Sequence, residues 1–167
     1  MVATARAPLD RIRLLVLDVD GVMTDGRLYY GASGEELKVF NVRDGLGIKL
    51  VMSAGVAVGV ISGRTSAALA ARCRELGIEH CEQGCDDKVA ALERLLDRLG
   101  FDAGEALCVV DDTSDLPLMR KVGHAVAVAD AHADVRRAAD RVTTLPGGWG
   151  AVREVCDWLL AASGARS

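Results

Sequence analysis

The segment Ile12-Arg13-Leu14-Leu15-Val16-Leu17-Asp18-Val19-Asp20-Gly21 begins as an apolar run and ends abruptly in two aspartates and a glycine. Apolar residues that follow one another without polar alternation are typical of a strand buried on both faces. We therefore expect residues 12–17 to form an inner strand of a parallel sheet. Further strand candidates follow along the chain, at residues 56–61, 78–83, 106–110, 125–129 and 141–144.

Segments with apolar residues at helical spacing separate the predicted strands. The expected helices span residues 44–54, 65–77 with Thr65 as N-cap, 86–99, 114–122, 133–139 and 149–162. Continuous apolar strands separated by helices predict an α/β fold with a doubly wound, Rossmann-like parallel sheet. A β-hairpin over residues 27–40, with the glycine-rich turn Gly31-Ala32-Ser33-Gly34, is predicted to be inserted after the first strand.

Length and composition limit the classes of protein to consider. The 167 residues, half of them hydrophobic, predict a single domain over residues 1–167. A net charge of −4 disfavours a nucleic-acid partner, which would need clustered positive charge. No apolar run approaches the roughly 18–20 residues that span a bilayer, and residues 1–13 lack the apolar block of a secretory signal. We therefore expect a cytoplasmic protein with no membrane partner, whose five cysteines are free thiols.

Polar side chains follow three of the predicted strands at the point where each strand ends. Asp18 and Asp20 follow the first, and Ser62-Gly63-Arg64 follows the second. Asp111 and Asp112 follow the fourth, Asp115 lies one helical turn further on, and Lys88 opens the helix after the third strand. Because ligands of doubly wound sheets bind at the carboxyl ends of the strands, these side chains are expected to meet in one site.

Phosphoryl transfer through an aspartyl-phosphate would suit such a group of side chains. A carboxylate can attack phosphorus directly and form an intermediate that water later removes. Mg²⁺, which prefers oxygen ligands, could be held by Asp18 and Asp111 and would reduce the repulsion between carboxylate and phosphate. Asp20 could protonate the leaving oxygen and then deprotonate the attacking water, while Ser62 and Lys88 balance the phosphoryl charge.

At these residues the sequence resembles the haloacid dehalogenase superfamily of phosphatases. The four motifs stand in the family's order: Asp18-Val19-Asp20-Gly21-Val22-Met23-Thr24, Ser62-Gly63-Arg64, Lys88, and Asp111-Asp112-Thr113-Ser114-Asp115. Three further stretches resemble the 3-deoxy-D-manno-octulosonate 8-phosphate phosphatase family within it, namely residues 25–30, 34–45 and 147–155. Val126-Ala127-Val128-Ala129-Asp130-Ala131 matches the same group, so the likeness covers nearly the whole chain.

The resemblance implies a role for each matching residue. Asp18 would be the nucleophile and Asp20 the general acid and base. Mg²⁺ would be held by the carboxylates of Asp18 and Asp111 and by the main-chain carbonyl of Asp20. Ser62 and Lys88 would contact the phosphoryl group.

The remaining implied roles lie around this centre. Asp112 and Asp115 would act indirectly, by supporting the residues that touch metal and phosphate. Gly63 and Arg64 would bind substrate, with Arg64 facing an acidic sugar, and Arg43 is a weaker candidate for the same task. The family normally has glycine before the paired aspartates, whereas this chain has Val110, which could displace Asp111 or shift the loop.

The chain has no room for the cap domain that phosphatases of this superfamily commonly carry. Only the hairpin and one helix fit between Asp18 and Ser62, and only one helix and one strand between Ser62 and Lys88. The hairpin is expected to expose Leu28, Tyr29, Tyr30, Leu37, Val39 and Phe40, and such a patch usually marks an interface. We therefore expect a homo-oligomer in which the hairpin covers a neighbour's site, and the resemblance implies a homotetramer.

The leading interpretation is a Mg²⁺-dependent phosphatase for an acidic 3-deoxy-2-keto sugar phosphate, with 3-deoxy-D-manno-octulosonate 8-phosphate as the substrate that the resemblance favours. A nonulosonate (sialic-acid-type) 9-phosphate is a close alternative, because related phosphatases share these motifs. A low-activity oligomerisation module related to nucleotidyl-sugar synthetases is the other alternative. The presence of all the carboxylates, Ser62 and Lys88 argues against that module, while Val110 is the one mark in its favour.

Overall fold

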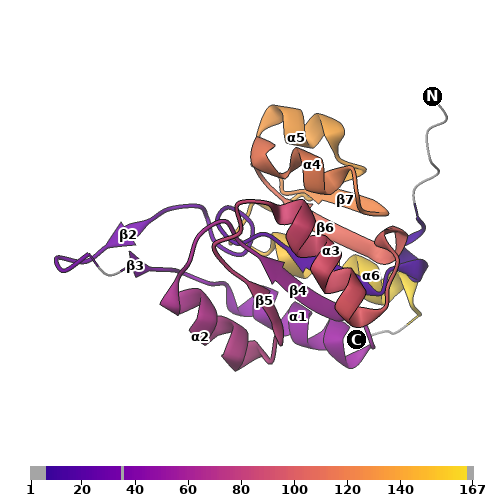
Figure 1. The fold of residues 1–167 in the computed structure, drawn as a ribbon, viewed down its shortest axis with the longest axis horizontal. Coiled ribbons are helices and arrows are strands. Elements are labelled where there is room, and N and C mark those ends of the chain that lie inside the picture. Colours follow the sequence, from indigo (N-terminus) through magenta and orange to yellow (C-terminus); the bar gives the residue numbers. More distant parts are fainter. Residues whose placement is uncertain (1–6, 35, 165–167) are drawn as a thin grey trace.

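A six-stranded parallel sheet forms the centre of the molecule, as a computed structural model describes it for residues 7–34 and 36–164 (Figure 1). The sheet has the order β5-β4-β1-β6-β7-β8. Its strands are β1 (Leu14–Leu17), β4 (Ala57–Ile61), β5 (His80–Glu82), β6 (Ala106–Val110), β7 (His124–Ala127) and β8 (Arg141–Val142). The predicted doubly wound α/β fold is therefore confirmed. Residues 1–6 and 165–167, which are predicted to belong to the same single domain, lie outside the described residues.

The first predicted strand lies in the middle of the sheet, between β4 and β6. Leu14 pairs with Ala57 on one side and with Ala106 on the other, and the registers continue to Leu17. All four residues of β1 and all five of β6 are buried, which explains why both read as continuous apolar runs. Their carboxyl ends consequently stand next to each other at the same edge of the sheet.

Helices cover both faces of this sheet. They are α1 (Val42–Ser53), α2 (Ala67–Leu76), α3 (Lys88–Leu99), α4 (Leu116–Met119), α5 (Ala133–Ala138) and α6 (Ala151–Ala162), with 3₁₀ turns η1 (Leu9–Arg11), η2 (Ala103–Glu105) and η3 (Thr113–Asp115). In Figure 1, α4 and α5 lie on one side of the sheet and α1 and α2 on the opposite side. Helix α1 also packs along α6. None of the helices in the described part of the chain is long and apolar enough to cross a membrane.

Two local predictions need correction. The N-cap of α2 is Ser66, whose hydroxyl accepts a hydrogen bond from the Leu69 N–H, and not Thr65. The helix predicted over residues 114–122 is a 3₁₀ turn followed by the four residues of α4. Pro117 has no N–H with which to bond the Thr113 carbonyl, so a regular α-helix cannot extend back over this segment.

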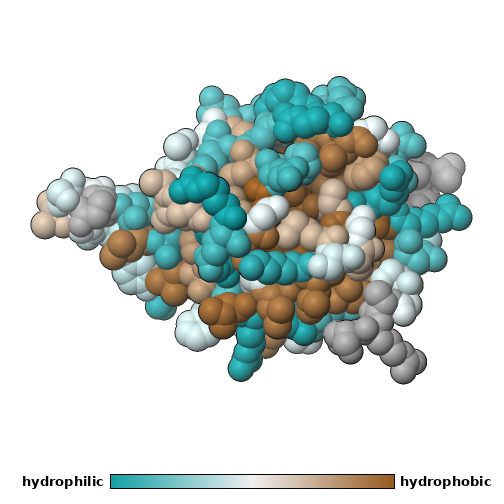
Figure 2. All heavy atoms as spheres, turned by 90° about the horizontal axis from the view of Figure 1, so that it is seen from below, coloured by the Kyte–Doolittle hydropathy of each residue, from teal (hydrophilic) through white to brown (hydrophobic). Residues whose placement is uncertain are grey.

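The predicted hairpin is formed by β2 (Tyr29–Tyr30) and β3 (Glu36–Leu37), which pair in antiparallel orientation. It projects from the body of the molecule, and hydrophobic side chains lie near its base (Figures 1 and 2). Tyr30 and Leu37 are each 61% exposed. Phe40 is an exception to the expected exposed set: it packs against the core beside the Arg72 guanidinium. In the described part of the chain, only the hairpin and α1 lie between β1 and β4, so no cap domain is inserted there.

Candidate active site

A cavity of about 300 Å³ opens at the carboxyl ends of β1, β4 and β6. Its lining contains eight of the predicted site residues: Asp18, Asp20, Ser62, Gly63, Arg64, Lys88, Asp111 and Asp112. Asp115 lies behind this lining and is fully buried. Arg43 is exposed at the start of α1 and is not among the lining residues of its own chain, so its role stays a prediction. Cys85, Asp86 and Ser114 complete the lining and were not predicted.

Three aspartates and one lysine form the centre of the site. One carboxylate oxygen each of Asp18, Asp111 and Asp115 lies within 4.8 Å of those of the other two. The Lys88 ammonium is 2.9 Å from Asp18 Oδ1 and 2.6 Å from Asp115 Oδ1. Asp115 thus lies within the cluster, because its position at the end of η3 brings its side chain against Lys88.

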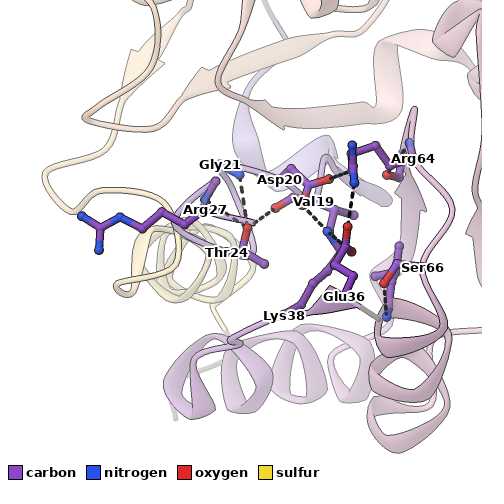
Figure 3. A network of polar contacts seen from close by, with 12 residues as sticks. Val19, Asp20, Gly21, Thr24, Arg27, Glu36, Lys38, Arg64 and Ser66 are labelled. Carbon is purple, nitrogen blue, oxygen red and sulfur yellow. Dashed lines mark hydrogen bonds and ion pairs between the residues drawn. The ribbon is translucent and has the colours of Figure 1, made fainter. Parts of the chain in front are cut away.

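The turn after β1 fits closely around this cluster. Gly21 has φ +90°, and a Cβ at that position would lie 1.9 Å from Asp111 Oδ2. Only glycine therefore permits both this backbone conformation and this approach. The Thr24 hydroxyl accepts hydrogen bonds from the N–H groups of Gly21 at 3.3 Å and Gly26 at 3.2 Å, which closes the turn (Figure 3).

The loop at residues 147–148 supports the same turn from outside. The Gly148 N–H donates to the Val22 carbonyl at 2.9 Å. A Cβ on Gly147 would lie 1.7 Å from the Gly21 carbonyl oxygen. This glycine pair therefore lets two backbones meet directly beside the site.

Charge crowding changes the titration of the cluster. Burial, together with the neighbouring Asp18 carboxylate, raises the pKa of Asp111 to about 8. Burial and Asp18 likewise raise the pKa of Asp115 to about 6, although Lys88 opposes the shift. Burial tends to lower the pKa of Lys88, but Asp18 and Asp115 outweigh it and the pKa of this ammonium is raised. Two carboxyls of the metal-free site therefore hold protons more tightly than exposed aspartates do.

The same cluster has the donor set that a divalent cation requires. Asp115 Oδ2 is buried and has no hydrogen-bond partner among the described residues. Together with the convergent oxygens of Asp18 and Asp111, this leaves more negative charge than Lys88 alone balances. Hard cations such as Mg²⁺ take carboxylate oxygens as ligands, so the residues present fit such an ion.

Asp20 is not part of this cluster and belongs to a second group of charges. Lys38 donates to Asp20 Oδ1 and lies 3.0 Å from Glu36 Oε1. Arg64 Nη2 donates to Glu36 Oε2 at 2.6 Å, and Arg64 Nε lies 3.7 Å from Asp20 Oδ2. Figure 3 shows the four side chains turned toward one another. We refer to Asp20, Lys38, Glu36 and Arg64 as the charge ring.

Lys38 and Glu36 were not predicted as site residues. Both lie in the hairpin segment 34–45, whose likeness to the family could have pointed to them. Contact with Arg64, and then with Lys38, lowers the pKa of Glu36 to about 2. The base of the hairpin therefore contributes charged groups to the site of its own chain.

Ser62, Asp112 and Val110 lie beside the cluster at different depths. Ser62 is 2% exposed, and its hydroxyl accepts a hydrogen bond from the Arg64 N–H at 3.2 Å. Asp112 accepts from the Thr113 N–H at 2.6 Å and so begins η3. Val110 is fully buried in β6, where it pairs with Ala127. Asp111 remains in the carboxylate cluster, so Val110 does not displace it.

Comparison with known proteins places the chain in a family. A model of haloacid dehalogenase-like hydrolases matches residues 81–146. The 3-deoxy-D-manno-octulosonate 8-phosphate phosphatase KdsC of Escherichia coli (strain B / BL21-DE3) is 49% identical over 97% of this chain and 86% of its own. The chain belongs to the 3-deoxy-D-manno-octulosonate 8-phosphate phosphatases of the haloacid dehalogenase-like hydrolases.

Solved structures of this phosphatase family have the same fold. The structure of the Yersinia pestis 3-deoxy-D-manno-octulosonate 8-phosphate phosphatase superimposes with a TM-score of 0.93 at 47% identity, and covers 94% of this chain and 85% of that one. The Moraxella catarrhalis enzyme was crystallised with magnesium ion, phosphate ion and KDO. It has a TM-score of 0.91 at 40% identity over 93% of this chain and 90% of that one.

Proposed function

We propose that this protein is a Mg²⁺-dependent phosphatase that hydrolyses 3-deoxy-D-manno-octulosonate 8-phosphate. The observation that carries the proposal is the Asp18 carboxylate at the end of β1, set between Lys88 and two further carboxylates. Membership in the family named for this reaction supports the choice of substrate. The magnesium, phosphate and KDO bound in the Moraxella catarrhalis enzyme support the choice of metal and of ligand class.

The metal site is assigned to the cluster around Asp18. The carboxylates of Asp18 and Asp111 would hold Mg²⁺, with the Asp20 main-chain carbonyl as a further ligand and Asp115 close behind. When bound, the ion supplies positive charge that offsets the repulsion between the Asp18 carboxylate and the phosphate dianion. Lys88 holds Asp18 and Asp115 in place and adds a second positive charge beside the phosphoryl group.

The chemical steps are assigned to residues of the cavity. An Asp18 carboxylate oxygen attacks phosphorus, and the bond between phosphorus and the sugar oxygen breaks. Asp20 gives its proton to the departing oxygen and then takes a proton from the water that cleaves the aspartyl-phosphate. Ser62 and Lys88 donate hydrogen bonds to the phosphoryl oxygens, where negative charge is concentrated.

The acidic end of the substrate is assigned to Gly63 and Arg64 at the rim, with Arg43 as a weaker candidate. Arg64 is already bonded to Glu36 and to the Tyr30 hydroxyl at 3.2 Å. A substrate carboxylate would therefore share or replace these partners. Since a guanidinium presents five donors in a fixed fork, it can bind a second carboxylate.

A phosphate-release assay with matched substrates tests this function. The purified protein with MgCl₂ is given 3-deoxy-D-manno-octulosonate 8-phosphate, a nonulosonate 9-phosphate and glucose 6-phosphate, which lacks the carboxylate. We expect the highest kcat/KM for the eight-carbon substrate. Preference for the nine-carbon substrate would change the substrate assignment, and absence of turnover with all three would support the oligomerisation module instead.

The raised pKa of Asp111 predicts a pH-dependent effect of magnesium. Between its usual value of 3.8 and the value of about 8 in the folded protein, the Asp111 carboxyl holds a proton that the unfolded chain has released. The metal-free protein therefore loses stability as pH rises through this range. At the upper end of the range, fewer protons occupy the carboxyl, so Mg²⁺ binds it more readily. We expect MgCl₂ to raise the Tm more at pH 8 than at pH 5.5 in differential scanning fluorimetry.

The control for this measurement is Asp111→Asn, which removes the titrating group. Its Tm should respond weakly to MgCl₂, with little difference between the two pH values. An equal magnesium shift for the unaltered protein at both pH values would contradict the assignment of Asp111.

The quaternary structure is proposed to be a homotetramer in which the hairpin of one subunit lies over the site of another. Five apolar side chains exposed on or beside the hairpin support this: Leu28, Tyr29, Tyr30, Leu37 and Val39. Leu37→Asp is expected to give a monomer or dimer in multi-angle light scattering at micromolar concentration. Val142→Asp, at an exposed position of the edge strand β8, should leave the tetramer intact. A monomeric mass for the unaltered protein would refute the proposal.

A further inference from the structure

The charge ring gives the hairpin a role within its own chain, separate from any contact with a neighbour. We propose that Lys38 is a positioning residue that holds the Asp20 carboxylate in the orientation needed for proton transfer to the leaving oxygen. The proposal rests on the proposed function, because that function makes Asp20 the proton donor. It assigns a task to a lysine that lies outside the carboxylate cluster and is not itself a lining residue of the cavity.

The four side chains of the ring alternate in charge, and each contacts the two on either side. Asp20 uses Oδ1 for Lys38 and Oδ2 for Arg64. Glu36 uses Oε1 for Lys38 and Oε2 for Arg64. Lys38 thus holds Asp20 Oδ1 closely, whereas Oδ2 has only the 3.7 Å ion pair with Arg64 and can carry the proton that Asp20 transfers. Rotation of the Asp20 carboxylate would break both of these contacts at once.

Burial distinguishes the two cations of the ring. The Lys38 side chain is 2% exposed, whereas that of Arg64 is 45% exposed. A buried ammonium has little access to water as a replacement partner. If Lys38 moved away from Asp20, its charge would stay buried with one partner fewer, which is unfavourable. Arg64 can exchange partners with solvent and also bonds to Tyr30. Lys38 is thus the fixed member of the ring, and Arg64 remains available for substrate.

The main chain places Lys38 accurately at this point. It follows β3 directly, and β3 is paired with β2, so the returning arm of the hairpin carries the ammonium to Asp20. A proton donor must lie within hydrogen-bond reach of the atom that it protonates. Small errors in orientation lower the rate strongly in such steps. Loss of Lys38 should therefore impair the protonation of the leaving group by Asp20.

The test therefore varies the leaving group and leaves the rest of the substrate simple. We compare kcat/KM for p-nitrophenyl, phenyl and benzyl phosphate, which lack the carboxylate that would involve Arg64. The leaving group becomes poorer from p-nitrophenyl to phenyl to benzyl phosphate, and the benzyl alkoxide oxygen needs a proton to depart. Since kcat/KM covers only the steps through departure of the alcohol, the later attack of water does not contribute.

Lys38→Met is expected to lower kcat/KM for benzyl phosphate by about 10- to 100-fold, which is part of the roughly 10²- to 10⁴-fold that general acid catalysis contributes. For p-nitrophenyl phosphate the loss should stay below about 3-fold, because that oxygen departs without protonation. Lys38→Arg keeps a cation at the position and should restore most of the benzyl phosphate activity. Arg27→Met is the matched control, since Arg27 is an exposed hairpin cation paired with Asp25 at 3.8 Å.

Each outcome has a defined reading. An equal loss with all three esters, or none, would overturn the positioning role while leaving the phosphatase assignment in place. If the unaltered protein hydrolyses none of the esters or the sugar phosphates, the proposed function fails and the role of Lys38 fails with it. If Lys38→Met does not fold, Glu36→Gln serves as a second variant, because it removes the charge of the other partner of Lys38. We expect a smaller loss of kcat/KM, which again grows as the leaving group becomes poorer.

Discussion

Asp18→Asn is expected to abolish phosphate release, by on the order of 10³-fold or more in kcat. An amide oxygen is a poor nucleophile toward phosphorus, so the aspartyl-phosphate cannot form. The substitution keeps the size of the side chain, and the Asp18 main-chain N–H still donates to the Val109 carbonyl at 3.1 Å. The loss should therefore be chemical, with the thermal unfolding of the protein largely preserved. Continuous phosphate detection with the sugar phosphate and MgCl₂ measures it.

The matched control is Asp157→Asn. Asp157 lies on α6, is half exposed, and pairs with Arg153 at 2.8 Å, away from the cavity. It should retain full activity under the same conditions. If Asp18→Asn kept more than a few per cent of the activity, a mechanism through this carboxylate would be untenable.

Lys88→Met is expected to destabilise the metal-free protein by about 3 kcal/mol at pH 8, the scale of breaking a buried ion pair. The change removes the ammonium that contacts Asp18 and Asp115, in a cluster where a third carboxylate lies close by. At pH 5 the loss should be clearly smaller. Asp111 and Asp115, with pKa values of about 8 and about 6, are then largely protonated and need less compensation. Lys88 remains charged over this whole range, because its pKa is raised above 10.5.

Urea denaturation in EDTA at the two pH values measures this effect. Lys121→Met is the matched control: Lys121 pairs with Glu93 at 3.4 Å with both side chains more than half exposed, so its loss should cost less than about 0.5 kcal/mol. In the presence of Mg²⁺, phosphate release by Lys88→Met should fall by about 10²-fold, as for loss of one preorganised donor. A pH-independent loss of stability would argue that Lys88 contributes only through packing of its aliphatic chain.

The apolar runs and the aspartates that follow them are enough to predict the sheet and the position of the site along it. Four-residue and five-residue apolar runs without alternation are typical of strands buried on both faces, and β1 and β6 are so buried. The residues after these strands then had to converge at one edge, as Asp18 and Asp111 do. The ends of helices are harder to predict from sequence than their presence, as the segment around Pro117 illustrates. The choice between a 3₁₀ turn and an α-helix there depends on single hydrogen bonds.

The distribution of charge within the site, in contrast, depends on contacts between segments that are distant in the sequence. Asp115 lies four residues beyond Asp111 and could equally have faced solvent, but η3 buries it against Lys88. Lys38 lies 18 residues from Asp20 in a hairpin whose pairing is local. No spacing rule relates those two residues, since their contact depends on how the hairpin folds back over the strand ends. The spacing of motifs thus predicts which side chains meet at the strand ends of the sheet, whereas the contacts of a projecting hairpin depend on long-range packing.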